Sequence, residues 1–228
     1  QLANKKFGKP ADSLVLSQDP DCLDTWFSSA LFPFSTMGWP DNTPDMKKYY
    51  PGHLLETGND ILFFWVARMI MAGYEYKGDL PFHNVYFTGI IRDKKGRKMS
   101  KSLGNSPDPL VLIAQYGADA LRFGTMRSAP LGLDVLFDEK DVELGRNFCN
   151  KLWNACRFRQ MQGGESEGEI NPEQLSSDDK WILRRLGQAI DEVSIALEAY
   201  RFSDATAALY RFFWSEYCDW YIESCKAT

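Results

Sequence analysis

A basic loop between a strand-like run and a helix start is the feature that most constrains this 228-residue chain. Residues His83 to Ile91 are rich in β-branched and aromatic types, a composition that favours a strand. Lys95-Gly96 predicts a turn, and Ser106 to Pro109 contains the prolines typical of a first helical turn. The loop Arg92 to Asn105 therefore follows the end of a strand, where ligands bind in α/β sheets.

The loop carries the chemical groups of a polyphosphate site. Lys98 and Lys101 supply two ammonium groups, and Ser100 and Ser102 supply two hydroxyl groups. Lysine binds phosphate as a point charge on a flexible stem. Phosphoryl-type transition states need charge stabilisation more than covalent help. For an arbitrary stretch rich in lysine and serine, a solvated basic loop would be the alternative interpretation.

The run Lys98-Met99-Ser100-Lys101-Ser102, followed by Leu-Gly-Asn, resembles the KMSKS motif of class I aminoacyl-tRNA synthetases, in their valyl/isoleucyl/leucyl branch. The resemblance implies that Met99, Ser100, Lys101 and Ser102 bind ATP. Lys101, and secondarily Lys98, would stabilise the departing pyrophosphate through a closing loop. ATP is implied as a substrate with Mg²⁺, without a tightly bound cofactor and without a protein-held metal.

Two stretches upstream carry the same resemblance. The run Leu23 to Ser29 is similar to the family's WFxS motif, in which Trp26 would pack on the amino-acid side chain. Gly58-Asn-Asp60 is similar to the family's GxD motif, so Gly58 and Asp60 would hold the adenosine moiety. Trp65 would be the second tryptophan of the amino-acid pocket. From the residues alone, Asp60 as a helix cap is the alternative.

The aromatic stretch Asp19 to Pro40 is interrupted by Pro33 and Gly38, so it predicts no long regular element. Its simplest role is in a hydrophobic core. The part from Leu31 onward resembles valyl members of the family. Just before it, the chain has Ala30, where the family more often has glycine. Valine is therefore the implied amino acid. An isoleucyl enzyme, whose substrate is one methylene larger, is the alternative.

The composition changes at Asp138, where a long helix is predicted as far as Gln160. Its apolar positions define a core-facing stripe: Val142, Phe148, Leu152, Ala155 and Cys156. Its opposite face carries candidate tRNA-binding residues: Arg146, Asn147, Lys151 and Arg157. A solvated bundle face and an RNA-binding face remain equally open interpretations. Further helices are predicted over 178–199 and 203–226, and the second resembles the family's anticodon-binding domain.

The predicted fold class is α/β plus all-α: the C-terminal half of a class I Rossmann-like nucleotide-binding domain followed by a helical bundle. Residues 1–18 form an incoming arm with a strand candidate at 13–16, and residues 19–127 form the nucleotide-binding half. Residues 128–137 form an irregular connector, and residues 138–228 form part of the anticodon-binding domain. Within 19–127 a buried strand is expected at 54–57, with helices at 61–72, 108–116 and 118–127.

Composition limits the remaining possibilities. A net charge of −5 excludes a general polyanion binder, so contact with tRNA requires a local basic face. Five cysteines without a CxxC pair, and only two histidines, argue against a zinc site and fit a reducing compartment. The apolar run at 61–72 is too short to span a membrane. A cytoplasmic monomer that binds ATP, valine and the valine-specific tRNA is expected, with a non-catalytic tRNA-binding module as the alternative.

The family's first motif, His-x-Gly-His, is missing from this sequence. In class I synthetases that motif holds the triphosphate and stabilises the attacked α-phosphate, so the chain alone is expected to be inactive. It begins at Gln1 without a methionine and ends directly after a predicted helix. Both ends are therefore expected to be cuts in a longer protein.

Overall fold

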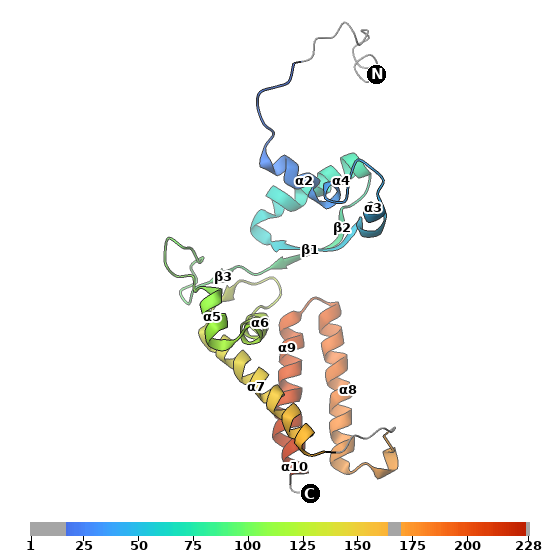
Figure 1. Cartoon of the computed structure of the whole chain (residues 1–228), viewed down its shortest axis with the longest axis vertical. Coiled ribbons are helices and arrows are strands. Elements are labelled where there is room, and N and C mark those ends of the chain that lie inside the picture. Colours follow the sequence, from blue (N-terminus) through green and yellow to red (C-terminus); the bar gives the residue numbers. More distant parts are fainter. Residues whose placement is uncertain (1–16, 164–169, 227–228) are drawn as a thin grey trace. The chain divides into compact units, whose positions relative to one another are not determined.

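The computed structural model describes residues 17–163 and 170–226, which fall into two compact units (Figure 1). The described part of the first unit is 17–53 with 61–83, and that of the second is 54–60 with 84–163 and 170–226. The strand candidate at 13–16 lies outside the described residues. None of the described helices is long and apolar enough to cross a membrane.

The first unit is built from short helices around one aromatic cluster. Its elements are α2 (Thr25–Ser35), α3 (Pro44–Tyr49), a π-helical turn (Leu62–Val66) and α4 (Ala67–Lys77), with α2 packed against α4 (Figure 1). Phe34 is fully buried, and the rings of Trp39 and Tyr50 meet it edge-on at centroid distances of 5.3 and 6.1 Å. Burial of such aromatic rings stabilises the unit.

Helix α2 contradicts the prediction that 19–40 has no long regular element. The Asp24 carboxylate caps this helix by accepting the Trp26 N–H at 3.2 Å. Pro33 lies in the last turns, where its missing N–H would otherwise bind the carbonyl of Ser29. That carbonyl accepts the indole N–H of Trp65 at 3.4 Å instead, so a tertiary contact replaces the lost helical bond.

The second unit begins with two small sheets. In the first, β1 (Gly52–Gly58) neighbours β2 (Phe82–Thr88). In the second, β3 (Ile91–Arg92) pairs in parallel with β4 (Val135–Leu136). Strand β4 corrects the prediction of an irregular 128–137, because the Asp134 carboxylate accepts the Ile90 N–H at 3.0 Å and brings this segment beside β3. The predicted strand at 54–57 is present, but only Thr57 of it is buried.

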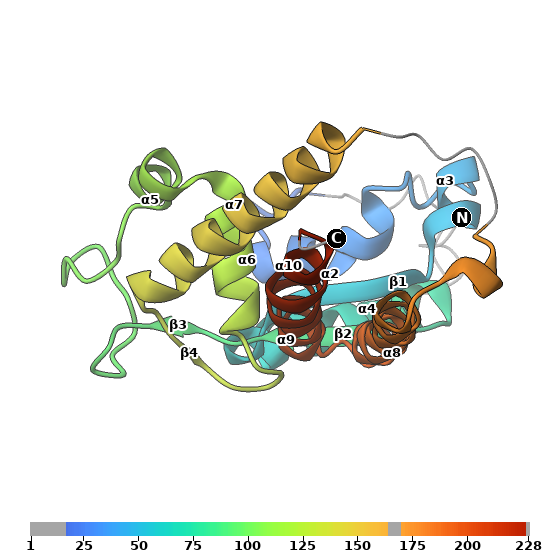
Figure 2. The same ribbon diagram turned by 90° about the horizontal axis from the view of Figure 1, so that it is seen from below.

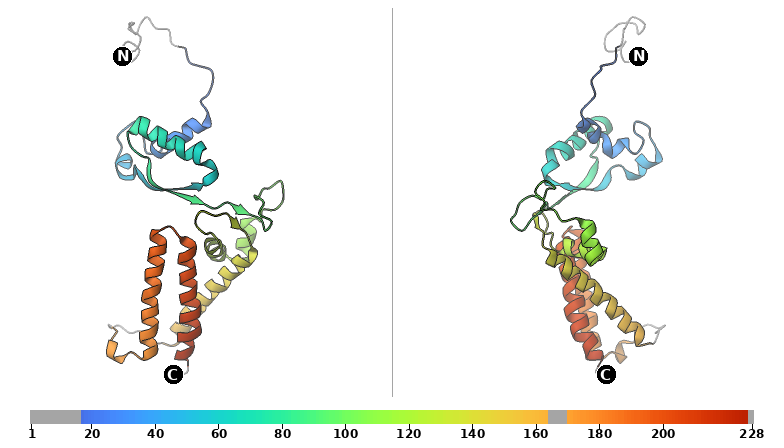
Figure 3. Two further views of the ribbon diagram at one scale, coloured as in Figure 1. Left: turned by 180° about the vertical axis from the view of Figure 1, so that it is seen from behind. Right: turned by 60° about the vertical axis from the view of Figure 1, so that its left-hand side comes forward.

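Helices form the rest of the second unit. They are α5 (Pro109–Tyr116), α6 (Ala118–Arg127), α7 (Glu139–Met161), α8 (Ser177–Glu198) and α9 (Phe202–Tyr210), and the last continues through a π-helical segment (Arg211–Ile222) into α10 (Glu223–Cys225). Helices α8 and α9 run side by side, and α7 lies oblique to them and packs against α6 and the π-helical segment (Figures 2 and 3). The predicted bounds of α5 to α8 hold to within a few residues, and the helix predicted at 203–226 is the continuous run from α9 through the π-helical segment to α10.

Helices α6 and α7 cross at a glycine contact. A Cβ atom at Gly145 would lie 2.3 Å from the Ala120 carbonyl oxygen, and one at Gly124 would lie 2.4 Å from the Asp141 carbonyl oxygen. Beside the crossing, the rings of Phe123 and Phe148 stack at 4.3 Å. Only glycine permits backbones to approach this closely, so these two positions fix the crossing.

The predicted core stripe of α7 is right for its first half only. Val142 and Phe148 are buried, but Leu152 is 42% exposed and Cys156 is also exposed. Helical spacing defines a face, but it does not show whether a neighbour covers that face along its whole length. Among the described residues, the buried side chains of α7 therefore lie in its N-terminal half.

Helix α8 begins with a capping box. Ser176 accepts the Asp179 N–H at 3.1 Å, and Asp179 accepts the Ser176 N–H at 2.9 Å. The hydroxyl of Tyr221 also donates to Asp179 at 2.6 Å. These donors, that of Tyr221 first, lower the pKa of Asp179 below its ordinary value of 3.8.

Replacement of Tyr221 by phenylalanine is expected to destabilise the chain at neutral pH and to have less effect in acid. Because the folded pKa of Asp179 is lowered, its stabilisation is present above 3.8 and is lost as the pH falls through the lowered value. Urea unfolding at neutral pH and below pH 3.8 measures this difference. Tyr74→Phe, at an exposed ring, is the control. A pH-independent effect of Tyr221→Phe would contradict the assignment.

Candidate functional site

The basic loop 92–105 folds as a small hairpin that starts at β3. Arg92 and Lys98 form an antiparallel bridge, and the Asp93 N–H donates to the Arg97 carbonyl at 2.9 Å. The Gly96 N–H donates to the Asp93 carbonyl at 2.8 Å, and Gly96 has a φ of +75°, which confirms the predicted turn. The hairpin brings the start of the KMSKS run back beside its own strand.

Asp93 is the centre of a hydrogen-bond network that the sequence interpretation missed. Its carboxylate accepts the backbone N–H groups of Lys95 and Arg97, each at 2.9 Å, and the Arg97 Nε–H at 2.8 Å. It also accepts the side-chain amide of Asn105 at 3.0 Å. These bonds, that of Asn105 first, hold the pKa of Asp93 far below its usual range. Aspartate at the start of a turn was the available sequence signal.

Asn105 closes the other side of the loop. Its Oδ1 accepts the Ser100 N–H at 2.9 Å, and its Nδ2 reaches the Lys98 carbonyl at 3.4 Å. The hydroxyls of Ser100 and Ser102 lie 3.1 Å apart, and the Leu103 N–H donates to Ser100 Oγ at 3.3 Å. Both serine hydroxyls are therefore engaged within the loop. Met99 lies between Lys98 and Ser100 and is partly buried.

The structure brings Lys98 and Asp60 together. Lys98 Nζ lies 3.3 Å from Asp60 Oδ2, with the two side chains 64% and 49% exposed. A Cβ atom at Gly58 would lie 2.8 Å from Asp60 Oδ1, so the glycine leaves room for this carboxylate. The capping alternative is wrong, because the following π-helical turn is preceded by Ile61 and has no side-chain cap. Lys101 is exposed and makes no ion pair with any described residue.

Trp26 and Trp65 both belong to the first unit. Trp26 is partly buried on α2, where its ring lies 6.0 Å from that of Phe64 and 5.6 Å from the guanidinium of Arg68. Trp65, in the π-helical turn, is held by its bond to the carbonyl of Ser29 on α2. π-Helical turns inside helices occur often at functional sites. Two tryptophans from one pair of packed elements can build an apolar wall.

The four basic or polar candidates on α7 have different surroundings. Arg146 pairs with Glu143 at 3.3 Å, while Asn147 and Arg157 are exposed. Lys151 pairs with Asp219, and its Nζ lies 3.9 Å from the ring centre of Trp214. Lys151 thus faces the π-helical segment and differs from the expectation of one solvated basic face.

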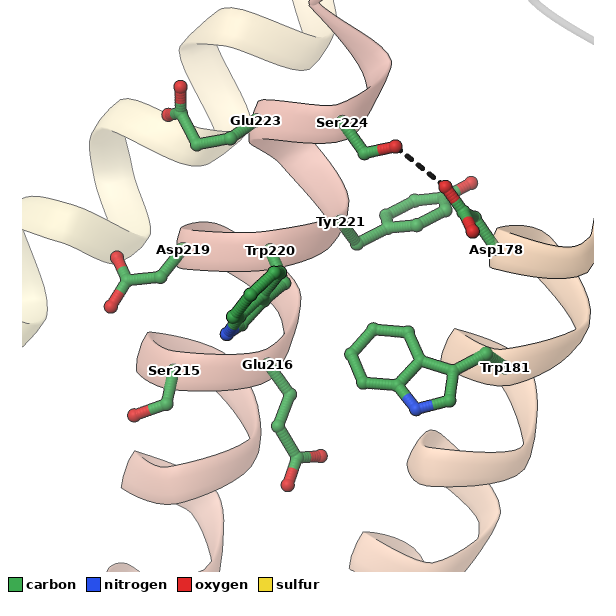
Figure 4. A pocket seen from close by; sticks show the side chains of 9 residues that line it. All are labelled: Asp178, Trp181, Ser215, Glu216, Asp219, Trp220, Tyr221, Glu223 and Ser224. Atoms are coloured by element: carbon green, nitrogen blue, oxygen red, sulfur yellow. Dashed lines mark hydrogen bonds between the residues drawn. The ribbon is translucent and has the colours of Figure 1, made fainter.

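A groove of about 820 Å³ opens between α8 and the π-helical segment (Figure 4). Trp181 and Trp220 line it from opposite sides. Its carboxylates all have partners within the described residues: Asp178 with Ser224, Glu216 with Arg185, Asp219 with Lys151, and Glu223 with Lys226. No cluster of metal-ligating side chains occurs among the residues that the structure describes. The groove therefore offers no set of free carboxylates to a cation.

Comparison with known families identifies the class of protein to which the chain belongs. Residues 1–138 match the family model of class I tRNA synthetases (I, L, M and V), and residues 179–228 match the anticodon-binding domain of tRNA ligases. The chain therefore belongs to the class I tRNA synthetases of this group. Its relatives include the valine–tRNA ligase of Thermotoga maritima, 54% identical over 94% of this chain and 25% of that protein. Another, from Phocaeicola vulgatus, is 55% identical over 99% of this chain and 26% of that protein.

The chain spans about a quarter of the length of the curated relatives it matches. Among solved structures it is similar to the LeuRS of Agrobacterium radiobacter K84 in a complex with tRNA and LeuAMS, with a TM-score of 0.70 and 26% identity over 86% of this chain and 26% of that one. It is also similar to Mycobacterium tuberculosis methionyl-tRNA synthetase bound to methionyl-adenylate, with a TM-score of 0.67 and 26% identity over 82% of this chain and 37% of that one. The predicted fold class is confirmed.

Proposed function

We propose that this chain forms the KMSKS-loop part of a valine–tRNA ligase. The complete protein joins valine to ATP, which yields valyl-adenylate and pyrophosphate, and then transfers valine to the terminal ribose of its tRNA. The observation that carries the proposal is the loop itself, in which Lys98 lies against Asp60 while Lys101 is unpaired among the described residues. The identity of 54% with a valine–tRNA ligase supports the choice of amino acid.

The loop supplies charge to the phosphates. Lys101 approaches the β- and γ-phosphates when the loop closes and neutralises the charge that develops on the departing pyrophosphate. Asp60 accepts hydrogen bonds from the ribose hydroxyls, and Gly58 lets the nucleoside approach the backbone. Since an exposed ion pair contributes only about 0–1 kcal/mol, the ribose can displace Lys98 from Asp60 at little cost. Ser100, Ser102 and Met99 shape the loop around the phosphates, and Mg²⁺ enters with ATP.

The remaining candidate residues bind the amino acid and the tRNA. Trp26 and Trp65 form the wall of the valine pocket. Arg146, Asn147 and Arg157 on α7 contact the tRNA backbone, and Lys151 contributes less because its side chain is only 24% exposed and lies against Asp219 and Trp214. The protein acts as a cytoplasmic monomer. The described part contains the basic loop but no His-x-Gly-His element, so the 228-residue chain alone does not activate valine.

Exchange of pyrophosphate into ATP tests this function. The assay uses valine, isoleucine and threonine with the 228-residue chain and with the complete protein in parallel. Valine-dependent exchange by the complete protein, and none by the chain alone, is expected. A preference for isoleucine would assign the chain to an isoleucyl enzyme. A folded but inactive complete protein that still binds tRNA would favour the non-catalytic module, and exchange by the chain alone would contradict its predicted inactivity.

A further inference from the structure

We propose that Asp93 and Asn105 are positioning residues that set the conformation in which the loop presents Lys98 and Lys101. The inference rests on the proposed function of the loop, because it concerns the same lysines. Neither residue carries a charge or hydroxyl to the phosphates in this role. Each acts through the backbone between them.

The geometry of Asn105 argues for this role. One side chain contacts the carbonyl of Lys98 and the N–H of Ser100, which flank Met99. These two contacts fix the backbone on both sides of one residue at the start of the motif. The direction of the Lys98 side chain, and the path of the chain toward Lys101, follow from that fixed backbone.

Asp93 anchors Asn105 in turn. Its side chain is only 12% exposed although it belongs to a surface loop, and Arg97 contacts it at 2.7 Å through a second guanidinium nitrogen. Charge-assisted hydrogen bonds of this kind are about twice as strong as neutral ones. The turn 93–97 and the run that starts at Lys98 are thus joined through one carboxylate and one amide.

The role of Asn105 requires a side chain with both a hydrogen-bond acceptor and a donor. Its oxygen accepts from Ser100 while its nitrogen donates to Asp93, and only a side chain with both functions makes both bonds. An aspartate there would retain the acceptor but place a second carboxylate against Asp93. An alanine would remove both bonds without adding charge.

The purely structural alternative is that the network only stabilises the fold. It predicts that loss of Asn105 lowers the thermal midpoint and leaves the activity per folded molecule unchanged. A positioning role predicts a lower activity per folded molecule, in excess of any fall in thermal midpoint. Because the loop is largely exposed, little apolar surface depends on it, and the loss appears in catalysis instead.

The decisive experiment compares Asn105→Ala, Asn105→Asp and the control Asn154→Ala in the complete protein. Asn154 is an exposed asparagine on α7. Both Asn105 variants are expected to lower kcat for valine-dependent pyrophosphate exchange by about 100-fold, since small misplacements of catalytic groups have effects of this size. The KM for valine should stay at the control value, and the loss of kcat should persist when activity is expressed per folded molecule, whatever the change in thermal midpoint. A matched fall in thermal midpoint with normal kcat would overturn the proposal.

A second measurement separates this inference from the proposed function. In the 228-residue chain, amide hydrogen exchange of Ser100 reports the bond to Asn105 directly. Loss of Ser100 protection in Asn105→Ala, with other amides unchanged, supports the positioning role even if the complete protein activates another amino acid. Unchanged protection of Ser100 would overturn the inference and leave the function of the loop untouched.

Discussion

Replacement of Lys101 by alanine in the complete protein is expected to slow valine activation by about 100- to 1,000-fold, the effect of removing one charge-stabilising donor from a reacting group. Lys101 has no ionic partner among the described residues, so its ammonium group is available to the phosphates. Because the interaction strengthens only as pyrophosphate departs, kcat should fall while the KM for valine stays nearly constant. Steady-state pyrophosphate exchange gives both values.

Lys95→Ala is the matched control for this prediction. Lys95 lies in the same loop and carries the same charge, and its described contact with Asp93 is made by its backbone N–H. Its replacement should leave kcat close to that of the unmodified protein. If both variants lost activity equally, the effect would come from the net charge of the loop, and the specific role of Lys101 would be refuted.

Gly145→Ala is expected to lower the free energy of unfolding by about 1–3 kcal/mol or more, the usual range for overpacking a well-packed contact. The added Cβ would lie 2.3 Å from the Ala120 carbonyl oxygen, which belongs to backbone and has no rotamer to change. Helices α6 and α7 would have to separate, which would also disturb the stacked rings of Phe123 and Phe148. Urea unfolding of the 228-residue chain measures the loss.

Gly187→Ala, also in a helix, is expected to raise the free energy of unfolding. Gly187 lies on α8, and a Cβ atom there would meet nothing within 4 Å. The substitution should stabilise the chain by about 0.5–1 kcal/mol, because alanine loses less conformational entropy in a helix than glycine does. Equal effects of the two substitutions would show that the crossing of α6 and α7 does not depend on glycine.

Signals that act over one turn could be predicted from the sequence. Asp108 caps α5, Gly117 ends it, and the Ser176–Asp179 box begins α8. Each of these signals depends on neighbours three or four residues away, so the local sequence contains all the necessary information. The motif resemblance added the fold class, which local signals alone would not give.

Features that depend on distant partners could not be predicted. Helix α2 was missed because it contains Pro33, which leaves the Ser29 carbonyl without a helical donor. The indole N–H that this carbonyl accepts belongs to Trp65, which is 36 residues away in the sequence. Strand β4 was missed because two residues carry too little pattern without the contact between Ile90 and Asp134. The second half of α7 was assigned to a core because periodicity does not report the length of the neighbouring helix.

Some residues of the candidate site could be predicted from the sequence and others could not. The motif predicted Lys98 and Asp60, which the structure brings to 3.3 Å. It did not predict that Asp93 and Asn105 would hold the loop, because hydrogen bonds between a turn and a residue twelve positions later leave no periodic trace. The roles of Trp26, Trp65 and the α7 residues in binding remain predictions.

The bond between Trp65 and Ser29 has a consequence for how this protein tolerates change. The carbonyl of Ser29 has no helical donor, because the residue four positions later, Pro33, has no amide hydrogen to offer it. The indole N–H of Trp65 thus bonds to an acceptor that Pro33 leaves without a helical donor. A residue with an amide hydrogen at position 33 would offer that carbonyl a competing donor from its own helix.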